Sequence, residues 1–540
     1  MSEGAPRDLQ FGSFTSDPPW IVERDQLQWS ASLATIRSAT LREVPDLVRP
    51  RHFPPGLRVF RVAWHIGLAM LGWLVVERRR SRRQLANGGD PDTADTLSKS
   101  GVSRRLRVAA ERLGPTYIKL GQIISAGEGI FPMPLVDEFK KCRDQVPAED
   151  FAVVRAVIEE DLARPLEHVF SSFDRSPLAA ASIAQVHRAT LRSGEEVVVK
   201  VQRQTVSTLV HEDIKVMAWV APFLVGRIPI AALANPPALV ELFAQTITEE
   251  LDFRLEAENM LDIAESFARL GQRGYVVPRP HPELVTRRVL VMERLDGFLF
   301  DDVDAMRNAN VDTEKVVRTG MIGFMEGCML HGIFHGDLHG GNLFVMPDGR
   351  IALLDFGITG RMNAVERNAF LRLLVGGTMN DVKGQLRALR DLGALPPDTD
   401  LGDVIRELGL DKPVVDPTTL TQEELLVEIQ KILKALLAMG ARMPKILMLF
   451  VKNMVFLDAA IANLAPDLDI FEEIVNISTY FATHHGDEIA SEVGVAPDEF
   501  SVDLDGIRAS MGLTDGTEAF TYKELRERRE VIRQRLSGHR

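Results

Sequence analysis

The spacing of apolar residues changes along the chain, and each change predicts a different kind of secondary structure. From Val102 to about Leu162, apolar residues recur every three or four positions, as in "ERLGPTYIKLGQIIS", which predicts helices. Shorter runs follow, such as "ATLRSGEEVVVKVQR", and these predict strands joined by a turn at Ser193-Gly194. The pattern is helical again from about Val206 to Leu270, returns to strand in "RVLVMERLDG", and then predicts helices as far as Ala482.

The N-terminal part contains one conspicuous apolar segment. Residues 1 to about 50 are expected to be irregular, with Pro18-Pro19 and Pro54-Pro55 as breakers, and Leu85–Gly101 is expected to be a polar linker. Between them, "VAWHIGLAMLGWLVV" (Val62–Val76) is apolar, carries arginines on both sides and has tryptophans near its ends. These features favour an interfacial helix on an anionic membrane. A helix docked on the protein's own core is the alternative, and fifteen residues are short for a membrane span.

Composition narrows the class of protein. Apolar residues make up 45% and charged residues 26% of the 540 positions, which is typical of a globular protein with more than one domain or lobe. A net charge of -13 argues against nucleic acid as the main partner. The two cysteines, Cys142 and Cys328, lie far apart in apolar helical contexts, so we expect core residues and no disulfide framework.

The stretch "FHGDLHGGNLFVMPDGRIALLDFG" carries candidate chemistry. Asp337 and Asn342 stand five residues apart, and Asp355 follows an apolar run in Asp-Phe-Gly. In protein kinases this spacing belongs to a catalytic aspartate, a metal-binding asparagine and a metal-binding aspartate. The sequence therefore predicts a site for ATP and Mg²⁺. His335 and His339 are also i and i+4, but without a third ligand we expect them to support the loop rather than bind zinc.

A phosphoryl-transfer site also needs a cation. Lys200 ends the apolar run "EEVVVK", as the phosphate-contacting lysine of a kinase small lobe does. A carboxylate must hold such a lysine charged and in place. The helical "TEELDFRLEAEN" offers several candidates, namely Glu249, Glu250, Asp252, Glu256 and Glu258. A strand-rich segment followed by a larger helical one is the order of a two-lobed kinase, so the predicted fold is α+β and protein-kinase-like.

With these motifs in place, the chain resembles the UbiB/ADCK family of atypical, protein-kinase-like proteins over about residues 102–480. The matching motifs are "KLGQ", "PLAAASIAQVH", "VVVK", "ELD", "HGDLHGGN" and "DFG". The resemblance implies a helical extension at 102–150, an N-lobe at 151–296 with a helical insertion and a helical C-lobe at 297–484. Residues 1–84 would form an irregular, membrane-interacting N-terminus and 485–540 a charged tail.

The resemblance also implies roles for individual residues. Lys200 would pair with Glu256, while Asp337 would be catalytic and Asn342 and Asp355 would hold the metal. The implied ATP-binding residues are Ala179, Ala180, Ala181, Ser182, Met292 and Glu293. The implied substrate-restricting residues are Lys119, Gln122, Glu250 and Asp252. Lys119 would be tied to Glu250. In the family this extension blocks the place where a kinase holds its peptide.

Alanines replace the glycines that protein kinases place over the phosphates. A Cβ makes positive φ and close backbone approach costly, so the loop Ala179–Ser182 is expected to be stiff. The alternative is a strand end whose small residues serve packing alone. Two departures from the family pattern are Leu338 and Gly340, where prolines are usual, and "AGEGIFPMP" (Ala126–Pro134), which replaces an "RPDLLP"-like stretch.

Three functions are compatible with the sequence. The first is an ATPase at the cytoplasmic face of a membrane, most simply a bacterial cell membrane, supporting isoprenoid quinone or prenyl-lipid metabolism. Its expected partners are ATP, membrane lipids, quinone precursors and lipid-biosynthetic enzymes. The second is a phosphotransferase on a protein or a small molecule such as an antibiotic. The third is a nucleotide-gated scaffold with little turnover.

Overall fold

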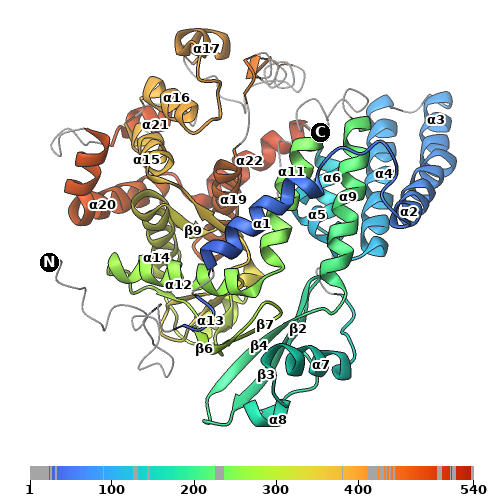
Figure 1. The fold of residues 1–540 in the computed structure, drawn as a ribbon. Coiled ribbons are helices and arrows are strands. Elements are labelled where there is room, and N and C mark those ends of the chain that lie inside the picture. Colours follow the sequence, from blue (N-terminus) through green and yellow to red (C-terminus); the bar gives the residue numbers. More distant parts are fainter. Residues whose placement is uncertain are drawn as a thin grey trace. The chain divides into compact units, whose positions relative to one another are not determined.

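A computed structural model describes residues 24, 27–30, 33–88, 90–125, 132–142, 146–224, 236–379, 381–410, 424, 431–432, 435–436, 439–441, 444–494, 502–510, 513 and 519–536. The chain divides into two compact units (Figure 1). The N-unit holds Asp17–Leu261 and Pro278–Leu295, and the C-unit holds mainly Asp262–Val277 and Asp296–Arg540.

The N-unit contains an antiparallel sheet in the order β1-β3-β4-β7-β6, with β2 added to β3. The strands are β1 (Phe170–Phe173), β2 (Ala179–Ala180), β3 (Ala184–Leu191), β4 (Glu196–Gln202), β6 (Pro280–Val285) and β7 (Val289–Glu293). Valines on β4 alternate inward and pack with residues of α7 (Phe151–Leu162) and α8 (Leu166–Val169), which lie beside β3 in Figure 1. The predicted turn at Ser193-Gly194 is confirmed, and Gly194 has a φ of 101° that only glycine adopts without strain.

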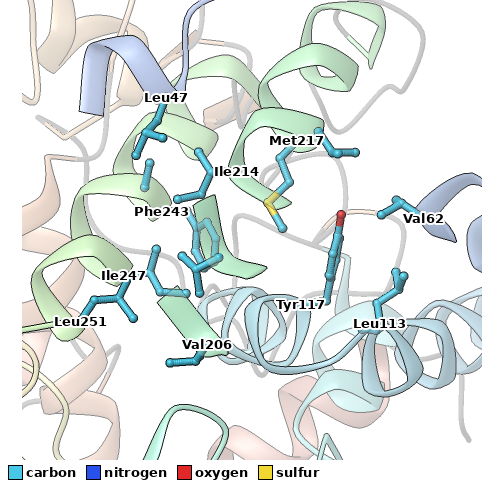
Figure 2. Packing of buried hydrophobic residues seen from close by; sticks show 14 of the residues in the cluster. Leu47, Val62, Leu113, Tyr117, Val206, Ile214, Met217, Phe243, Ile247 and Leu251 are labelled. Atoms are coloured by element: carbon cyan, nitrogen blue, oxygen red, sulfur yellow. The ribbon is translucent and has the colours of Figure 1, made fainter. Parts of the chain in front are cut away.

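The helices of the N-unit surround a second apolar core. Leu113, Tyr117, Ile214 and Phe243 come from four different helices and meet there (Figure 2). The helices are α1 (Leu33–Leu47), α2 (Arg58–Gly72), η3 (Trp73–Glu77), α3 (Arg78–Ala86), α4 (Pro91–Leu113), α5 (Pro115–Ser125), α6 (Met133–Phe139), α9 (Val206–Leu224), α11 (Pro236–Glu250) and the start of α12 (Phe253–Arg269).

Two expectations for the N-terminal part are wrong. The region expected to be irregular contains α1, and the region expected to be a linker is helical from Pro91 onward. Proline is well placed at the first turn of α4, because its missing N–H has no helical partner there. Gly101 does not break this helix, since its lack of a side chain makes room for Glu77, and Arg105 of α4 donates to Glu77 at 2.9 Å. The contacts between α4 and Glu77 thus stabilise a helix in a segment whose polar composition favours a loop.

Helix α2 continues through the π-turn η3 into α3, giving one helical stretch of 29 residues with an 18-residue window of mean hydropathy 1.7. The apolar run of fifteen residues is short for a membrane span, but the continuous helix that contains it is long enough. Apolar side chains on this stretch are exposed, including Trp64 at 65% and Leu71 at 58%. α3 then presents five arginines among its nine residues. The stretch is an apolar surface followed at once by a basic one.

The C-unit is mainly helical and contains two small sheets. Strand β11 pairs with β10 and β5, β10 also pairs with β8, and β12 pairs with β9. The strands are β5 (Tyr275–Val276), β8 (Phe298–Leu299), β9 (Ile333–His335), β10 (Leu343–Val345), β11 (Ile351–Leu353) and β12 (Thr359–Arg361). The helices are α13 (Val303–Asn308), α14 (Thr313–Glu326), η4 (Gly327–His331), η5 (Gly340–Asn342), α15 (Ala364–Thr378), α16 (Val382–Asp391), α17 (Leu401–Leu408), α19 (Lys445–Leu464), α20 (Ile470–Val493), α21 (Leu504–Ser510) and α22 (Tyr522–Leu536).

Gly121, the glycine of "KLGQ", allows α5 to approach α6. A Cβ at this position would lie 2.5 Å from Cδ1 of the buried Phe139. Gly67, in α2, is exposed, and a Cβ added to it would have no neighbouring atom within 4 Å. We expect Gly121→Ala to destabilise the protein by about 1–3 kcal/mol through overpacking, despite the helix propensity of alanine.

The matched control is Gly67→Ala, which should stabilise the protein by up to about 1 kcal/mol because it gains helix propensity without a clash. Urea unfolding of both variants measures the difference. Equal shifts in the two midpoints would contradict the close approach.

Candidate active site

The N-unit provides the cation of the candidate site. Lys200 lies on β4, and its Nζ is 2.7 Å from Glu256 Oε1 in the first turn of α12. The same Nζ lies 5.5 Å from the ring centroid of Phe253. Both charged side chains are largely buried, at 12% and 5% exposure. Because a desolvated lysine needs such a partner to remain charged, this pair fits a cation held for an anionic ligand.

The alanine loop is attached to its surroundings by backbone bonds. Val146 donates its N–H to Ala180 O at 3.1 Å, and Ala181 donates to Ala184 O at 2.8 Å. The buried Arg203 donates from Nε to Ala181 O at 3.0 Å, and Ser182 is buried. These bonds agree with the expectation of a stiff loop.

The "KLGQ" and "ELD" motifs lie next to each other in the N-unit. Lys119 on α5 forms an ion pair of 3.0 Å with Glu250 at the end of α11. Gln122 lies half-buried on α5. Asp252 instead acts locally, because it accepts the Arg254 N–H at the start of α12 and pairs with the Arg254 guanidinium at 2.6 Å.

The residues expected at the adenine, Met292 and Glu293, end strand β7. Met292 pairs with Val198 in the sheet, and the Glu293 N–H donates to Arg279 O at 2.9 Å. That bond occupies the Glu293 amide, so it is not available as a donor to a base.

The C-unit brings together the candidate catalytic loop, residues 335–342, and Asp355. Asn342 Nδ2 donates to Asp337 O at 3.0 Å, and the Leu354 N–H donates to Asn342 O at 2.8 Å. The first bond fixes the orientation of the Asn342 amide and makes its oxygen the atom that can face a cation. The segment "MPDGR" joins β10 and β11 as a hairpin, with Gly349 at a φ of 87°.

Asp355 has a φ of 55°, the left-handed region that non-glycine residues rarely adopt. Such a conformation costs on the order of 1–3 kcal/mol and is characteristic of functional sites. Its carboxylate and the Asn342 amide oxygen are the hard oxygen donors that Mg²⁺ prefers, with phosphate oxygens completing its shell. The donor set therefore fits Mg²⁺ bound together with a nucleotide. Within the described part of the chain, no group of three or more His, Cys, Asp and Glu side chains forms a metal cluster.

The two histidines of the loop hold it in shape, as expected. His335 Nε2 lies 3.0 Å from Leu354 O and 2.8 Å from Asp355 O, and its Nδ1 accepts the Asp337 N–H at 3.2 Å. Since carbonyl oxygens only accept, Nε2 carries the proton. His339 Nδ1 accepts the Gly341 N–H and caps η5.

Two further residues, both on α19, contact the loop. Lys452 Nζ forms a close ion pair with Asp337 Oδ1, and the buried Asn453 accepts the Leu338 N–H at 3.0 Å. In the sequence they are two polar residues within the apolar run "MPKILMLFVKNMVFLDAAIANLA", a pattern that favours a core helix. That signal was present, but it did not indicate the loop 115 residues away.

Comparisons with known proteins decide the family. A model of the ABC1 atypical kinase-like domain matches residues 141–389. A chloroplastic aarF domain-containing protein kinase of Arabidopsis thaliana is 30% identical, over 73% of this chain and 77% of its own. The chain belongs to the ABC1 atypical kinase-like family. The resemblance to UbiB/ADCK proteins and the α+β kinase-like fold are thereby confirmed.

Other ABC1 relatives differ in how much they share. A protein of Mycobacterium tuberculosis is 34% identical over 85% of this chain and 92% of its own. The probable protein kinase UbiB of Sodalis glossinidius is 31% identical over 56% of each chain. A Mycobacterium tuberculosis protein solved in complex with erythromycin covers 64% of this chain and 91% of its own at 21% identity, but its TM-score of 0.36 supports no further conclusion.

Within the ABC1 motif "PLAAASIAQVH", His187 is held neutral. Its Nδ1 lies 2.9 Å from Asp174 O and must donate, so Nε2 accepts from Gln185 Nε2 at 3.4 Å. Burial lowers the pKa of His187 below its ordinary value of 6.5.

A lowered folded-state pKa gives His187 a defined effect on stability. As pH falls below 6.5, the unfolded chain binds a proton that the folded protein resists, so the free energy of unfolding decreases. The decrease has a slope of up to about 1.4 kcal/mol per pH unit and continues down to the lowered pKa. Wild type should therefore lose its stability advantage over His187→Gln between pH 7.5 and 5, measured by urea unfolding. An advantage independent of pH would contradict the neutral, buried histidine.

Proposed function

We propose that this ABC1 protein is an atypical kinase-like ATPase that binds Mg-ATP and acts at the cytoplasmic face of a membrane. One observation carries the proposal. Each charged residue that phosphoryl transfer needs is present with a partner that positions it, as Lys200 is by Glu256 at 2.7 Å and Asp337 by the loop around it. Family membership supports the kinase-like chemistry.

The roles follow from the chemistry of the side chains. Lys200 contacts the phosphates of ATP, and Asn342 and Asp355 would hold Mg²⁺, which neutralises charge that develops on the phosphate oxygens. In hydrolysis the water oxygen forms a bond to the γ-phosphorus while the bond from that phosphorus to the bridging oxygen breaks. Asp337 accepts the water proton, and ADP leaves with the electron pair of the broken bond. If an acceptor hydroxyl replaces water, the same residues perform phosphotransfer.

The exposed apolar face of α2 and η3 supports action at a membrane surface. Trp64, Leu68 and Leu71 are 65%, 42% and 58% exposed and follow one another at helical spacing. The arginines of α3 come immediately after this face, where they would meet anionic headgroups. Helix α19 has the length and composition of a span as well. However, Lys452 and Asn453 at its middle contact the catalytic loop, which favours a core helix.

The substrate class is proposed from family membership. An ABC1 protein at a membrane has hydrophobic molecules within reach, and the resemblance to UbiB proteins supports isoprenoid quinone or other prenyl-lipid metabolism as the process served. The Lys119–Glu250 ion pair, which joins the extension to the insertion, supports a restricted acceptor site over an open peptide site.

ATP hydrolysis by the purified full chain tests this function. We expect turnover to rise at least about fivefold with vesicles of phosphatidylglycerol and cardiolipin and not with phosphatidylcholine, because the basic helix favours anionic lipid. Asp355→Asn should abolish turnover because it removes the metal-binding charge. The substitution should not disturb the backbone, because asparagine adopts the left-handed conformation as readily as aspartate does. Transfer of labelled γ-phosphate to a defined acceptor would instead establish a phosphotransferase. ATP binding without any turnover would establish the scaffold.

The membrane contact is tested separately. The double variant Trp64→Glu/Leu68→Glu should lose vesicle co-sedimentation and vesicle stimulation while keeping basal turnover. Val365→Glu, at a 69% exposed position of the C-unit, is the matched control and should keep both. Retained stimulation in the double variant would refute this face as the contact.

A further inference from the structure

The loop "HGDLHGGN" contains no lysine or arginine. His339, two residues after Asp337, does not take the place of a lysine or arginine, because its ring accepts the Gly341 N–H and caps η5. A carboxylate that must orient a nucleophile beside phosphates needs a cation, both to fix its direction and to offset its charge. In this chain the cation comes from elsewhere.

Helix α19 provides it. Lys452 forms its ion pair with Asp337 Oδ1, and the two side chains are 25% and 18% exposed. Fixing Oδ1 also fixes the direction of Oδ2, because the carboxylate is planar.

The next residue on α19, Asn453, holds the backbone on both sides of Asp337. Its Nδ2 donates to His335 O, and its Oδ1 accepts the Leu338 N–H at 3.0 Å. Asn453 is 0% exposed, so neither bond is exchanged with solvent. Leu338 is one of the positions that departs from the family's prolines, and a proline there would have no N–H to donate.

We propose that Lys452 is the positioning residue of Asp337 and offsets the charge of Asp337 beside the transferred phosphate, with Asn453 as the brace that keeps the loop at a fixed distance from α19. This inference rests on the proposed function for its chemistry. It assigns the middle of α19 to the active site.

Turnover tests Lys452 in the full chain with vesicles. Lys452→Met should lower kcat by about 10–100-fold, which is less than the roughly 10²–10⁴-fold that a positioned acid or base contributes, because Asp337 itself remains. Lys452→Arg should remain within about threefold of wild type. In the Asp337→Asn background, Lys452→Met should cause no further loss, because the residue acts through Asp337. A loss of kcat under twofold in Lys452→Met, or equal losses in both backgrounds, would overturn the proposal. An unchanged midpoint of thermal unfolding in Lys452→Met excludes a purely structural effect.

Nucleotide binding tests it without turnover. Lys452→Met leaves the charge of Asp337 uncompensated beside the γ-phosphate, so the Kd for ATP should rise about 3–10-fold while that for ADP changes little. Adding Asp337→Asn should restore ATP binding. If the wild type binds ATP but hydrolyses none, the proposed function fails. The Kd values of the wild type, the two single variants and the double variant would then still support or overturn the role of Lys452. Additive effects on Kd would overturn it.

Hydrogen exchange tests the brace. Asn453→Ala should raise exchange at the Leu338 amide at least tenfold, whereas Lys452→Met should leave it within about twofold of wild type. Unchanged exchange in Asn453→Ala would refute the brace.

Discussion

The need to hold the charge of Asp337 in place on a loop with little regular structure constrains the C-unit more than any other requirement. A helix or strand would satisfy its own backbone groups, but residues 335–342 must find partners elsewhere. The partners are buried and polar: His335 for the Asp337 N–H, Asn342 for its carbonyl and Asn453 for the Leu338 N–H. Each bond depends on a definite orientation of a ring or amide. The apolar packing of the surrounding helices serves to keep those orientations unique.

The N-unit solves a related problem with ion pairs. Lys200–Glu256 and Lys119–Glu250 each join two different elements and are mostly removed from water. The buried pair of Arg58 with Asp213, at 2.7 Å, does the same for α2 and α9. Such pairs contribute less to net stability than to specificity of placement, because desolvation offsets much of their attraction. In this unit they fix the start of the exposed helix and the position of the cation.

The sequence predicted the kinase-like fold and the positions of the strands around Lys200 because both depend on local pattern. The five-residue spacing of Asp337 and Asn342 carried the candidate site for the same reason. The helices at 33–47 and 91–101 were not predicted, because contacts distant in sequence stabilise them. Val44 and Leu47 of the first are buried in the core shared with α9 and α11, and Gly101 at the end of the second packs against Glu77 of η3. Lys452 and Asn453 could not be assigned, since nothing local relates α19 to a loop more than a hundred residues earlier. Residues 126–131, the larger part of the departure from the family pattern at Ala126–Pro134, lie outside the described residues.

Leu338 has a consequence for how this sequence can change over evolutionary time. Its amide is a donor that only a non-proline residue supplies, and Asn453 is the acceptor that uses it. Reversion to the proline usual in the family would leave a buried amide oxygen without its hydrogen bond, so position 453 would come under pressure to change at the same time. The two positions are therefore free to drift only as a pair. Changing either residue alone would leave the polar atom of the other, the Leu338 N–H or the Asn453 amide oxygen, buried without its hydrogen bond.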